Sequence, residues 1–536
     1  MQPPPAEPDY PYPPRFWWLK RITVVTAVVL LLLACVRVWW GWEASRRLQA
    51  EIDRIKAAGE PIEVADFTPV PVPDDQNAAP LLLKAIAMWD STNESSGDDR
   101  AYLADNAEAL ALVREARSRP AADWGVVLAT PMYATFPPAL GQCRQLANRL
   151  DDVARRQARL GAHTAAVETV RDILALAQRR NRGVPTLIGH LVAVSIEALG
   201  VRTLEAVYPM LILDEQAYSG PLSVAPATRL QVEDLIGELL NEQPWDESLE
   251  DSLFIERAML QDAARAIVDG QLSLSFLNTM NMAPKPSSWE RGSSLGVLAW
   301  SAMNVAPKPS SWERGFILLL KPAFELDAVR MMTFDSAVIH ASRRPTWPEA
   351  EAMFPPAPEK RSLKARLSRP FITRMSFNLP LNVRTYFQLL ALRRCAAIAL
   401  AFRLYELDHG SRPEELDQVV PQYLPSMAED PFHRERKWLR YLESGALGRP
   451  VVYSLGIDGK DQKGANRQSG SEGDDLPFYL DGDRHVGASV PDPGSTEAGE
   501  HQPDEPDHQR NPDEDQGGQD GPGQGQSDGK AQEPQA

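Results

Sequence analysis

A single apolar segment close to the N-terminus constrains this chain more than any other feature. Residues Ile22–Val36 have the sequence ITVVTAVVLLLLACV, fifteen positions without a charge. A helix needs roughly 20 residues to cross the ~30 Å hydrocarbon core of a bilayer. Residues 19–42 reach that length when the flanking basic side chains extend toward the headgroups, and tryptophans mark both ends, as in interfacial belts. We therefore expect a transmembrane helix over residues 19–42.

Two other interpretations of this segment compete with a span. A cleaved signal peptide needs small residues followed by polar sequence, and VRVWWGW is a poor start for a mature protein. A lipoprotein signal is suggested by Lys20-Arg21 and by Leu32-Leu33-Ala34-Cys35, which resembles a lipobox with Cys35 as the modified residue, although no polar tether follows. A span and a lipid anchor would both tie the body to a membrane.

Charge argues against nucleic acid as a partner. The net charge is −17, whereas a phosphate-binding surface needs clustered Lys and Arg. Residues 483–536 carry 13 acidic and 3 basic residues, are rich in Gly, Gln and Pro, and have too little apolar surface to fold. The three cysteines, Cys35, Cys143 and Cys395, are too few and too scattered for a disulfide framework or a cysteine zinc site.

The rest of the sequence predicts a mainly α fold. Apolar residues recur at helical spacing in Leu140–Val153 and in Ala166–Ala177, and Pro185–Val207 is apolar nearly all round, as in the buried helix of a bundle. We expect an N-terminal transmembrane helix, a helical bundle or array, a small α+β C-terminal module and a disordered acidic tail. The expected boundaries are a proline-rich disordered tail at 1–18, the span at 19–42, a stalk helix at 43–60, the bundle at 80–270, loops at 271–345, an irregular linker at 346–384, the C-terminal module at 385–482 and the acidic tail at 483–536.

The loop region contains an internal duplication. Met280–Gly292, MNMAPKPSSWERG, returns 23 residues later as MNVAPKPSSWERG at Met303–Gly315. A repeat architecture needs at least three copies that each bury a face, and these copies are rich in Pro and Ser. We interpret the duplication as tolerated loop length.

No catalytic constellation stands out. The sequence has no phosphate-binding Walker loop, no dinucleotide fingerprint and no HExxH zinc motif. His163 and His190 lie in helical segments without a second ligand three or four positions away, so core or surface histidines are the simpler interpretation. We therefore assign no catalytic residues and expect a non-enzymatic protein rather than an enzyme.

The last folded segment carries the most specific motifs. A helix over Cys395–Leu407 leads to Asp408-His409-Gly410, then to Asp430-Pro431-Phe432, two short strands and Ser454-Leu455-Gly456-Ile457-Asp458-Gly459. This segment resembles the C-terminal part of the major pseudopilins of type II secretion. The resemblance covers about 90 residues of the 536. The pseudopilin leader is absent and the apolar span lies far upstream, so a shared small α+β module is implied and filament assembly is not.

That resemblance implies a calcium-binding loop. The residues matching its acidic positions are Asp458, Asp474 and Asp475. Ca²⁺ prefers six to eight oxygen ligands, which carboxylates and the carbonyls of a glycine-rich turn supply. The alternative is a plain hairpin turn that uses Asp-Gly for positions with positive φ. Calcium is the one cofactor that we expect.

The whole layout also resembles a family of membrane-anchored helical proteins of planctomycete-type bacteria. The supporting residues are the stalk, PVPDDQNAAP at Pro71–Pro80, the Pro185–Ile188 helix start and the YSLGIDG motif that ends at Gly459. The family implies no particular activity. It favours a single-pass protein of the bacterial inner membrane with an extracytoplasmic body, although basic residues on both sides of the span leave the orientation open.

Three hypotheses for the function follow. The first is a membrane-anchored scaffold or interaction protein whose partner is an unidentified protein. The second is a secretion-associated, pseudopilin-like envelope component, which depends on the resemblance alone. The third is an envelope hydrolase whose site the sequence does not reveal.

Overall fold

The computed structural model describes residues 16–67, 71–90, 98–126, 128, 140–181, 186–214, 225–273, 309–356, 379–465 and 475–482. These residues are mainly helical with a few strands in a small sheet, which confirms the predicted fold class. They belong to one structural unit, Met1–Ala488. The first copy of the duplication and the acidic tail at 483–536 lie outside the described residues.

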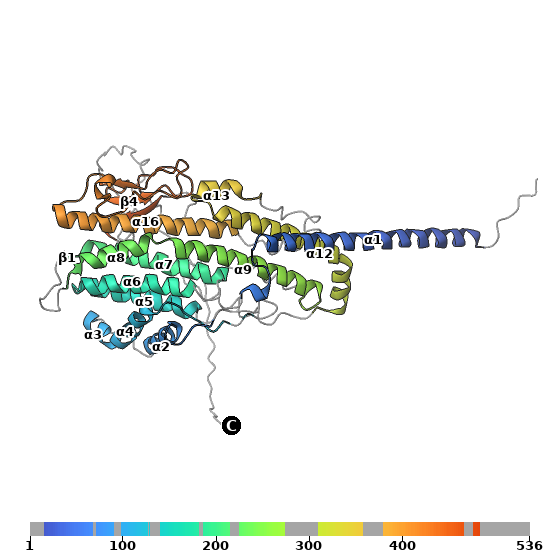
Figure 1. The fold of residues 1–536 in the computed structure, drawn as a ribbon, viewed down its shortest axis with the longest axis horizontal. Coiled ribbons are helices and arrows are strands. Elements are labelled where there is room, and N and C mark those ends of the chain that lie inside the picture. The colour runs from blue at the N-terminus through green and yellow to red at the C-terminus, as the bar shows by residue number, and fades with distance from the viewer. Residues whose placement is uncertain are drawn as a thin grey trace, which may run out of the picture. The chain divides into compact units, whose positions relative to one another are not determined.

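The N-terminal helix α1 (Trp17–Ala57) contains both the expected span and the expected stalk without a break. The side chains of its apolar half are exposed, and Leu31 for example is 65% exposed. Further along the helix Ala44 and Ile55 are fully buried, on the side that packs against helix α12 (Ser311–Ser342). Figure 1 shows the first half of α1 extending beyond the other helices. The helix is long and apolar enough to cross a membrane.

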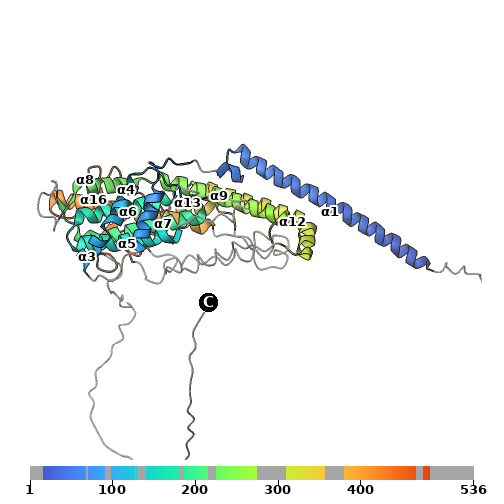
Figure 2. The same cartoon turned by 90° about the horizontal axis from the view of Figure 1, so that it is seen from below.

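A bundle of helices follows α1. Helices such as α5, whose apolar positions recur at helical spacing, bury one side. The helices pack side by side (Figures 1 and 2). Their bounds are α2 (Ala79–Asp90), α3 (Asp99–Asp105), α4 (Ala107–Ser118), α5 (Leu140–Arg159), α6 (His163–Asn181), α7 (Leu187–Val207), α8 (Arg229–Leu240) and α9 (Gln243–Val268), with the 3₁₀ turns η1 (Val64–Phe67) and η3 (Tyr208–Met210) and the two-stranded parallel sheet of β1 (Leu213–Asp214) and β2 (Ala227–Thr228).

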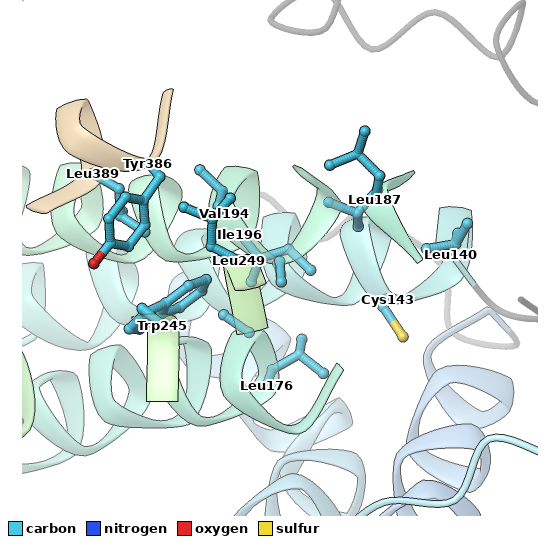
Figure 3. Packing of buried hydrophobic residues seen from close by; sticks show 14 of the residues in the cluster. Leu140, Cys143, Leu176, Leu187, Val194, Ile196, Trp245, Leu249, Tyr386 and Leu389 are labelled. Atoms are coloured by element: carbon cyan, nitrogen blue, oxygen red, sulfur yellow. The ribbon is translucent and has the colours of Figure 1, made fainter. Parts of the chain in front are cut away.

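The main hydrophobic core lies where these helices meet. Figure 3 shows side chains from α5, α6, α7, α9 and α16 (Leu379–His409) gathered in one place. Trp245 is the largest of them and is fully buried. The labelled residues are Leu140, Cys143, Leu176, Leu187, Val194, Ile196, Trp245, Leu249, Tyr386 and Leu389.

Helix α7 is a second helix with enough apolar length for a membrane span, but its position is internal. In its most apolar window 67% is buried inside the protein, and α7 packs against α5, α6, α9 and α16. Thr186 caps its first turn by accepting a hydrogen bond from the Gly189 amide. The prediction of a buried central helix is confirmed.

Helix α12 occupies a region for which we expected loops, at 271–345. Its start lies inside the second copy of the duplication, where Ser310 and Glu313 form a capping box. In that arrangement a serine and a glutamate three positions later satisfy each other's backbone amides. The loop prediction, which was based on the Pro- and Ser-rich composition, was therefore wrong for residues 311–342. The short helix α13 (Trp347–Met353) likewise falls within the linker expected at 346–384.

The C-terminal segment is packed onto the bundle. Helix α16 begins at Leu379, before the predicted boundary at residue 385. The sheet has the order β3 (Arg440–Leu442), β4 (Val451–Ser454) and β5 (Leu476–Tyr479), all antiparallel, and the 3₁₀ turn η5 (Leu416–Val419) precedes it. Residues of α16, β4 and β5 share one hydrophobic cluster with residues of α5–α8. The bundle and the C-terminal strands therefore have a common core.

Candidate calcium loop

Strands β4 and β5 bring the two ends of the candidate loop together. Ser454, at the end of β4, pairs with Leu476, at the start of β5. The loop that follows Ser454 and the residue that precedes Leu476, Asp475, therefore emerge from the same edge of the sheet. This edge also contacts α16, because the Cys395 thiol approaches the Leu476 carbonyl.

Two of the motifs noted in the sequence are joined by one carboxylate. Asp430 is fully buried. Its Oδ1 accepts hydrogen bonds from the Phe432 amide at 2.9 Å and from the Ser454 hydroxyl at 2.6 Å, and its Oδ2 accepts from the Leu455 amide at 2.9 Å. The Asp-Pro-Phe turn and the Ser-Leu-Gly segment thus form one unit that fixes the start of the loop.

Asp475 is the buried acid of the loop. It is fully buried, and its Oδ2 accepts hydrogen bonds from the amides of Gln462 at 3.0 Å and Gly464 at 2.8 Å. Its Oδ1 has no hydrogen-bond partner among the described residues. Burial, with the negative charges of Asp461 and Asp458 adding to it, raises the pKa of the Asp475 carboxyl to about 7. A cation beside Oδ1 would stabilise the charged carboxylate, and so would oppose both its burial and the repulsion from Asp461 and Asp458.

The other described acids of the loop hold the turn in shape. Asp458 Oδ1 accepts from the Lys460 amide at 2.9 Å, and its Oδ2 accepts from the Gln462 side chain at 3.1 Å. Asp461 Oδ1 accepts from the Lys463 amide and from the Tyr453 hydroxyl, and Asp461 is ion-paired with Arg440. These contacts form a local turn, as expected for the alternative to a calcium site, which is a plain hairpin turn.

Gly464 closes this part of the loop against the sheet. Its φ of +76° is one that residues with side chains rarely adopt. A Cβ at this position would lie 2.7 Å from Val451 Cγ1. The Tyr479 hydroxyl donates to the Gly464 carbonyl at 2.9 Å. The backbone amide that binds Asp475 is therefore held in place by both strands.

A calcium ion fits this donor set only in part. Asp475 Oδ1 is a buried oxygen without a hydrogen-bond partner in the described part of the loop, and the charge of Asp458 contributes to the raised pKa of Asp475. Asp474, the third predicted ligand, lies outside the described residues. Within the described ranges, no three His, Cys, Asp or Glu side chains converge as metal ligands do.

Two buried groups of the bundle are further candidates for chemistry. His190 Nδ1 lies 2.9 Å from the Ser248 hydroxyl, and burial lowers the pKa of His190 to about 4. Glu256 on α9 is close to Asp335 on α12, and both are buried. His190 was a candidate from the sequence, whereas the carboxylate pair was not, because Glu256 and Asp335 are far apart in the chain. His163, the other histidine considered, is also buried.

Comparisons with known proteins add no assignment. No family model, no curated protein and no solved structure matches the chain. The resemblances to the planctomycete-type family and to the pseudopilin module therefore stay predictions from the residues quoted above.

Proposed function

We propose that this protein is a single-pass scaffold or interaction protein, anchored by α1 in the bacterial inner membrane with its body on the extracytoplasmic side. The observation that carries the proposal is the division of α1 into two halves. The first half exposes apolar side chains all round, whereas the second half is packed into the body through Ala44 and Ile55. A rigid connection of this kind holds a folded body at a fixed place on a membrane.

The described body favours a scaffold over the other two hypotheses. Its long helices share hydrophobic clusters and so form one packed body behind the anchor. In the secretion-associated alternative, α16 would be the module's principal helix. Here α16 packs against α7, α8, β4 and β5, and the apolar span lies in α1 instead.

The anchor is tested by placing charges in the span. Each arginine near the bilayer centre costs roughly 2.5–3.5 kcal/mol on insertion scales. We expect the full-length chain to stay in the membrane pellet after alkaline extraction and the variant V28R/L31R to be lost from it. The control V28A/L31A should behave like the wild type. Full-length, uncleaved protein in the detergent-free soluble fraction would overturn the proposal.

Orientation and lipid modification are tested separately. A membrane-impermeant maleimide should label L230C in spheroplasts, because Leu230 is an exposed residue of α8 in the body. Labelling only after lysis would place the body in the cytoplasm. Cys35→Ser should change neither the size of the product nor its place in the pellet, whereas a lipid anchor on Cys35 would be lost.

We also propose that the loop binds calcium through Asp458, Asp474 and Asp475. The support is Oδ1 of Asp475, which is buried and has no hydrogen-bond partner within the described ranges. Calcium at about 1 mM, within the affinity range of extracellular calcium modules, should raise the melting temperature of the full chain in detergent, and magnesium should not.

Two variants test the calcium site. Asp475→Asn should remove the calcium-dependent rise, because it removes the buried charge that the cation would neutralise. Asp481→Asn is the matched control, since Asp481 is paired with Arg449 outside the loop. Calcium should still raise the melting temperature of this variant. An equal rise in Asp475→Asn and in the wild type would rule out this site.

A further inference from the structure

The first turns of α12 expose an apolar surface where a water-soluble helix would be polar. Trp312, Phe316, Leu318 and Leu319 are 74%, 37%, 63% and 60% exposed. Trp312, Phe316 and Leu319 follow one another at spacings of four and three, so they form one stripe. A contiguous exposed apolar patch of this kind marks an interaction site. We call Ser311–Leu320 the α12 foot.

The opposite side of the foot is attached to the body. Ile317 is buried in a cluster with residues of α9. Glu313 is also buried and accepts a hydrogen bond from the Ser273 hydroxyl at 2.8 Å. The one acid of the foot thus points inward, and the exposed side carries Arg314 but no carboxylate.

The foot lies beside the end of the apolar half of α1. Arg37 donates from Nε to the Leu319 carbonyl at 2.9 Å and from Nη2 to the Leu318 carbonyl at 2.6 Å. Pro322 has no amide hydrogen, so it cannot satisfy the Leu318 carbonyl four residues earlier. Arg37 supplies the missing donor. A Cβ on Gly41 would lie 3.9 Å from the Pro322 ring.

Beyond Pro322 the two helices run side by side in the same direction. Ser45 donates to Glu325, and Arg54 reaches Ser336. Figure 1 shows that the first turns of α12 instead run across the line of α1, at the end of the body from which α1 projects. If α1 crosses a membrane, the foot therefore lies along that membrane's surface.

We propose that the α12 foot is an interfacial helix that inserts Trp312, Phe316, Leu318 and Leu319 into the headgroup region of the membrane crossed by α1. This proposal depends on the proposed anchor. A lipid surface is the occupant because the patch continues the exposed apolar surface of α1 through the Arg37 contact. Tryptophan and leucine beside Arg314, Lys321 and Arg37 match the composition of interfacial helices.

The experiment measures the depth of two labels in the reconstituted full chain. The foot is labelled with an environment-sensitive fluorophore at F316C in a Cys35→Ser background, where the remaining Cys143 and Cys395 are buried. The matched control is L230C, an exposed apolar residue, 67% exposed, on α8 away from α1 (Figure 1). Vesicles are equimolar phosphatidylcholine and phosphatidylglycerol, with or without doxyl-labelled lipid.

Insertion by about 5–10 Å should give the F316C label a blue-shifted emission. It should also give on the order of twofold stronger quenching by the doxyl lipid than at L230C. The charged variant W312D/L319D should reduce the quenching at F316C to the L230C level. A label accessible to aqueous iodide would overturn the proposal. So would a label shielded from both iodide and doxyl lipid, because a protein partner or a second copy would then cover the foot.

A third label separates failure of the foot from failure of the anchor. Native Cys35 lies in the apolar half of α1 and is exposed. Doxyl quenching at Cys35 without quenching at F316C would rule out insertion of the α12 foot but would agree with α1 as the membrane anchor. Absence of quenching at Cys35 would rule out both the proposed α1 anchor and the proposed insertion of the α12 foot.

Discussion

At the scale of single residues, a buried ion pair connects helices of the core. Glu197 on α7 and Arg393 on α16 pair with both side chains fully buried. Arg393 Nη2 also donates to the carbonyls of Glu238 and Asn241 at 2.6 and 3.0 Å, at the end of α8 where carbonyls lack helical partners. Burial lowers the pKa of Arg393 to about 9. One side chain thus links three helices.

Breaking this pair should destabilise the protein strongly. Arg393→Met leaves a charged Glu197 buried without its partner, and such changes cost about 3–5 kcal/mol of the free energy of unfolding. The double variant Glu197→Leu/Arg393→Met should recover only part of the loss, because two α8 carbonyls still lack a donor. Urea unfolding of the full chain in detergent measures both. A loss below about 1 kcal/mol in Arg393→Met would mean that the pair contributes no more than a surface salt bridge.

Glu256 should make the stability depend on pH. Burial raises the pKa of its carboxyl from 4.5 to about 7, and its neighbours include buried Asp335 and Arg257. The folded state therefore binds more protons than the unfolded state between these values. The contribution of Glu256 is fully present below pH 4.5 and is lost as the pH rises through 7.

The test compares the wild type with Glu256→Gln across that window. The variant should gain stability relative to the wild type as the pH increases, by up to about 3 kcal/mol. Glu233→Gln is the control, because Glu233 is exposed on α8. The difference in free energy of unfolding between this variant and the wild type should not change with pH. A flat difference for Glu256→Gln would show that this carboxyl has an ordinary pKa.

At the scale of elements, periodicity predicted the helices whose burial is one-sided. The α5 face with Leu140, Cys143 and Leu150 is buried as expected. Helix α12, which begins in Pro- and Ser-rich sequence, was not predicted, because that composition is typical of loops and was given more weight than the local capping residues. The Ser310–Glu313 capping box was visible in the sequence, and it is the signal that would have identified α12.

The candidate loop was predictable in position but not in its contacts. The Asp-Gly turn and the two strands before it, β3 and β4, were predicted from turn residues and short strand-like runs, whereas β5, the strand after the turn, was not. The hydrogen bonds that Asp430 accepts from Ser454 and Leu455 join segments more than twenty residues apart, and the sequence alone does not show that these segments meet. The role of Asp461 in binding Tyr453 and Arg440 was missed for the same reason.

The contact between α6 and α7 makes a prediction about glycine. A Cβ on Gly200 of α7 would lie 2.7 Å from Leu174 Cδ2 and 3.2 Å from Ile173 Cγ2 on α6. Gly200→Ala should therefore lower the free energy of unfolding by about 1–3 kcal/mol through overpacking. Gly237→Ala on α8 meets nothing within 4 Å and should instead stabilise by about 0.5–1 kcal/mol. Equal effects of the two substitutions in a denaturant titration would contradict the close packing.

At the scale of the whole molecule, the sequence suggested a C-terminal module, whereas the structure joins that segment to the bundle. Ala397 and Leu400 of α16 lie in the same cluster as Leu204 of α7 and Leu235 of α8. The Tyr479 amide of β5 donates to Glu205 of α7 at 2.8 Å.

This shared core predicts that residues 385–482 do not fold alone. Excision would expose the α16 face that now packs against α7 and α8, and apolar burial is the main favourable term in folding. The excised segment should lack a cooperative thermal transition by circular dichroism and should bind the dye ANS. By contrast, a chain ending at residue 482 keeps every described element and should keep the melting temperature of the full chain. A sharp transition in the isolated segment would mean that it has a sufficient core of its own and that its packing on α7 and α8 is dispensable.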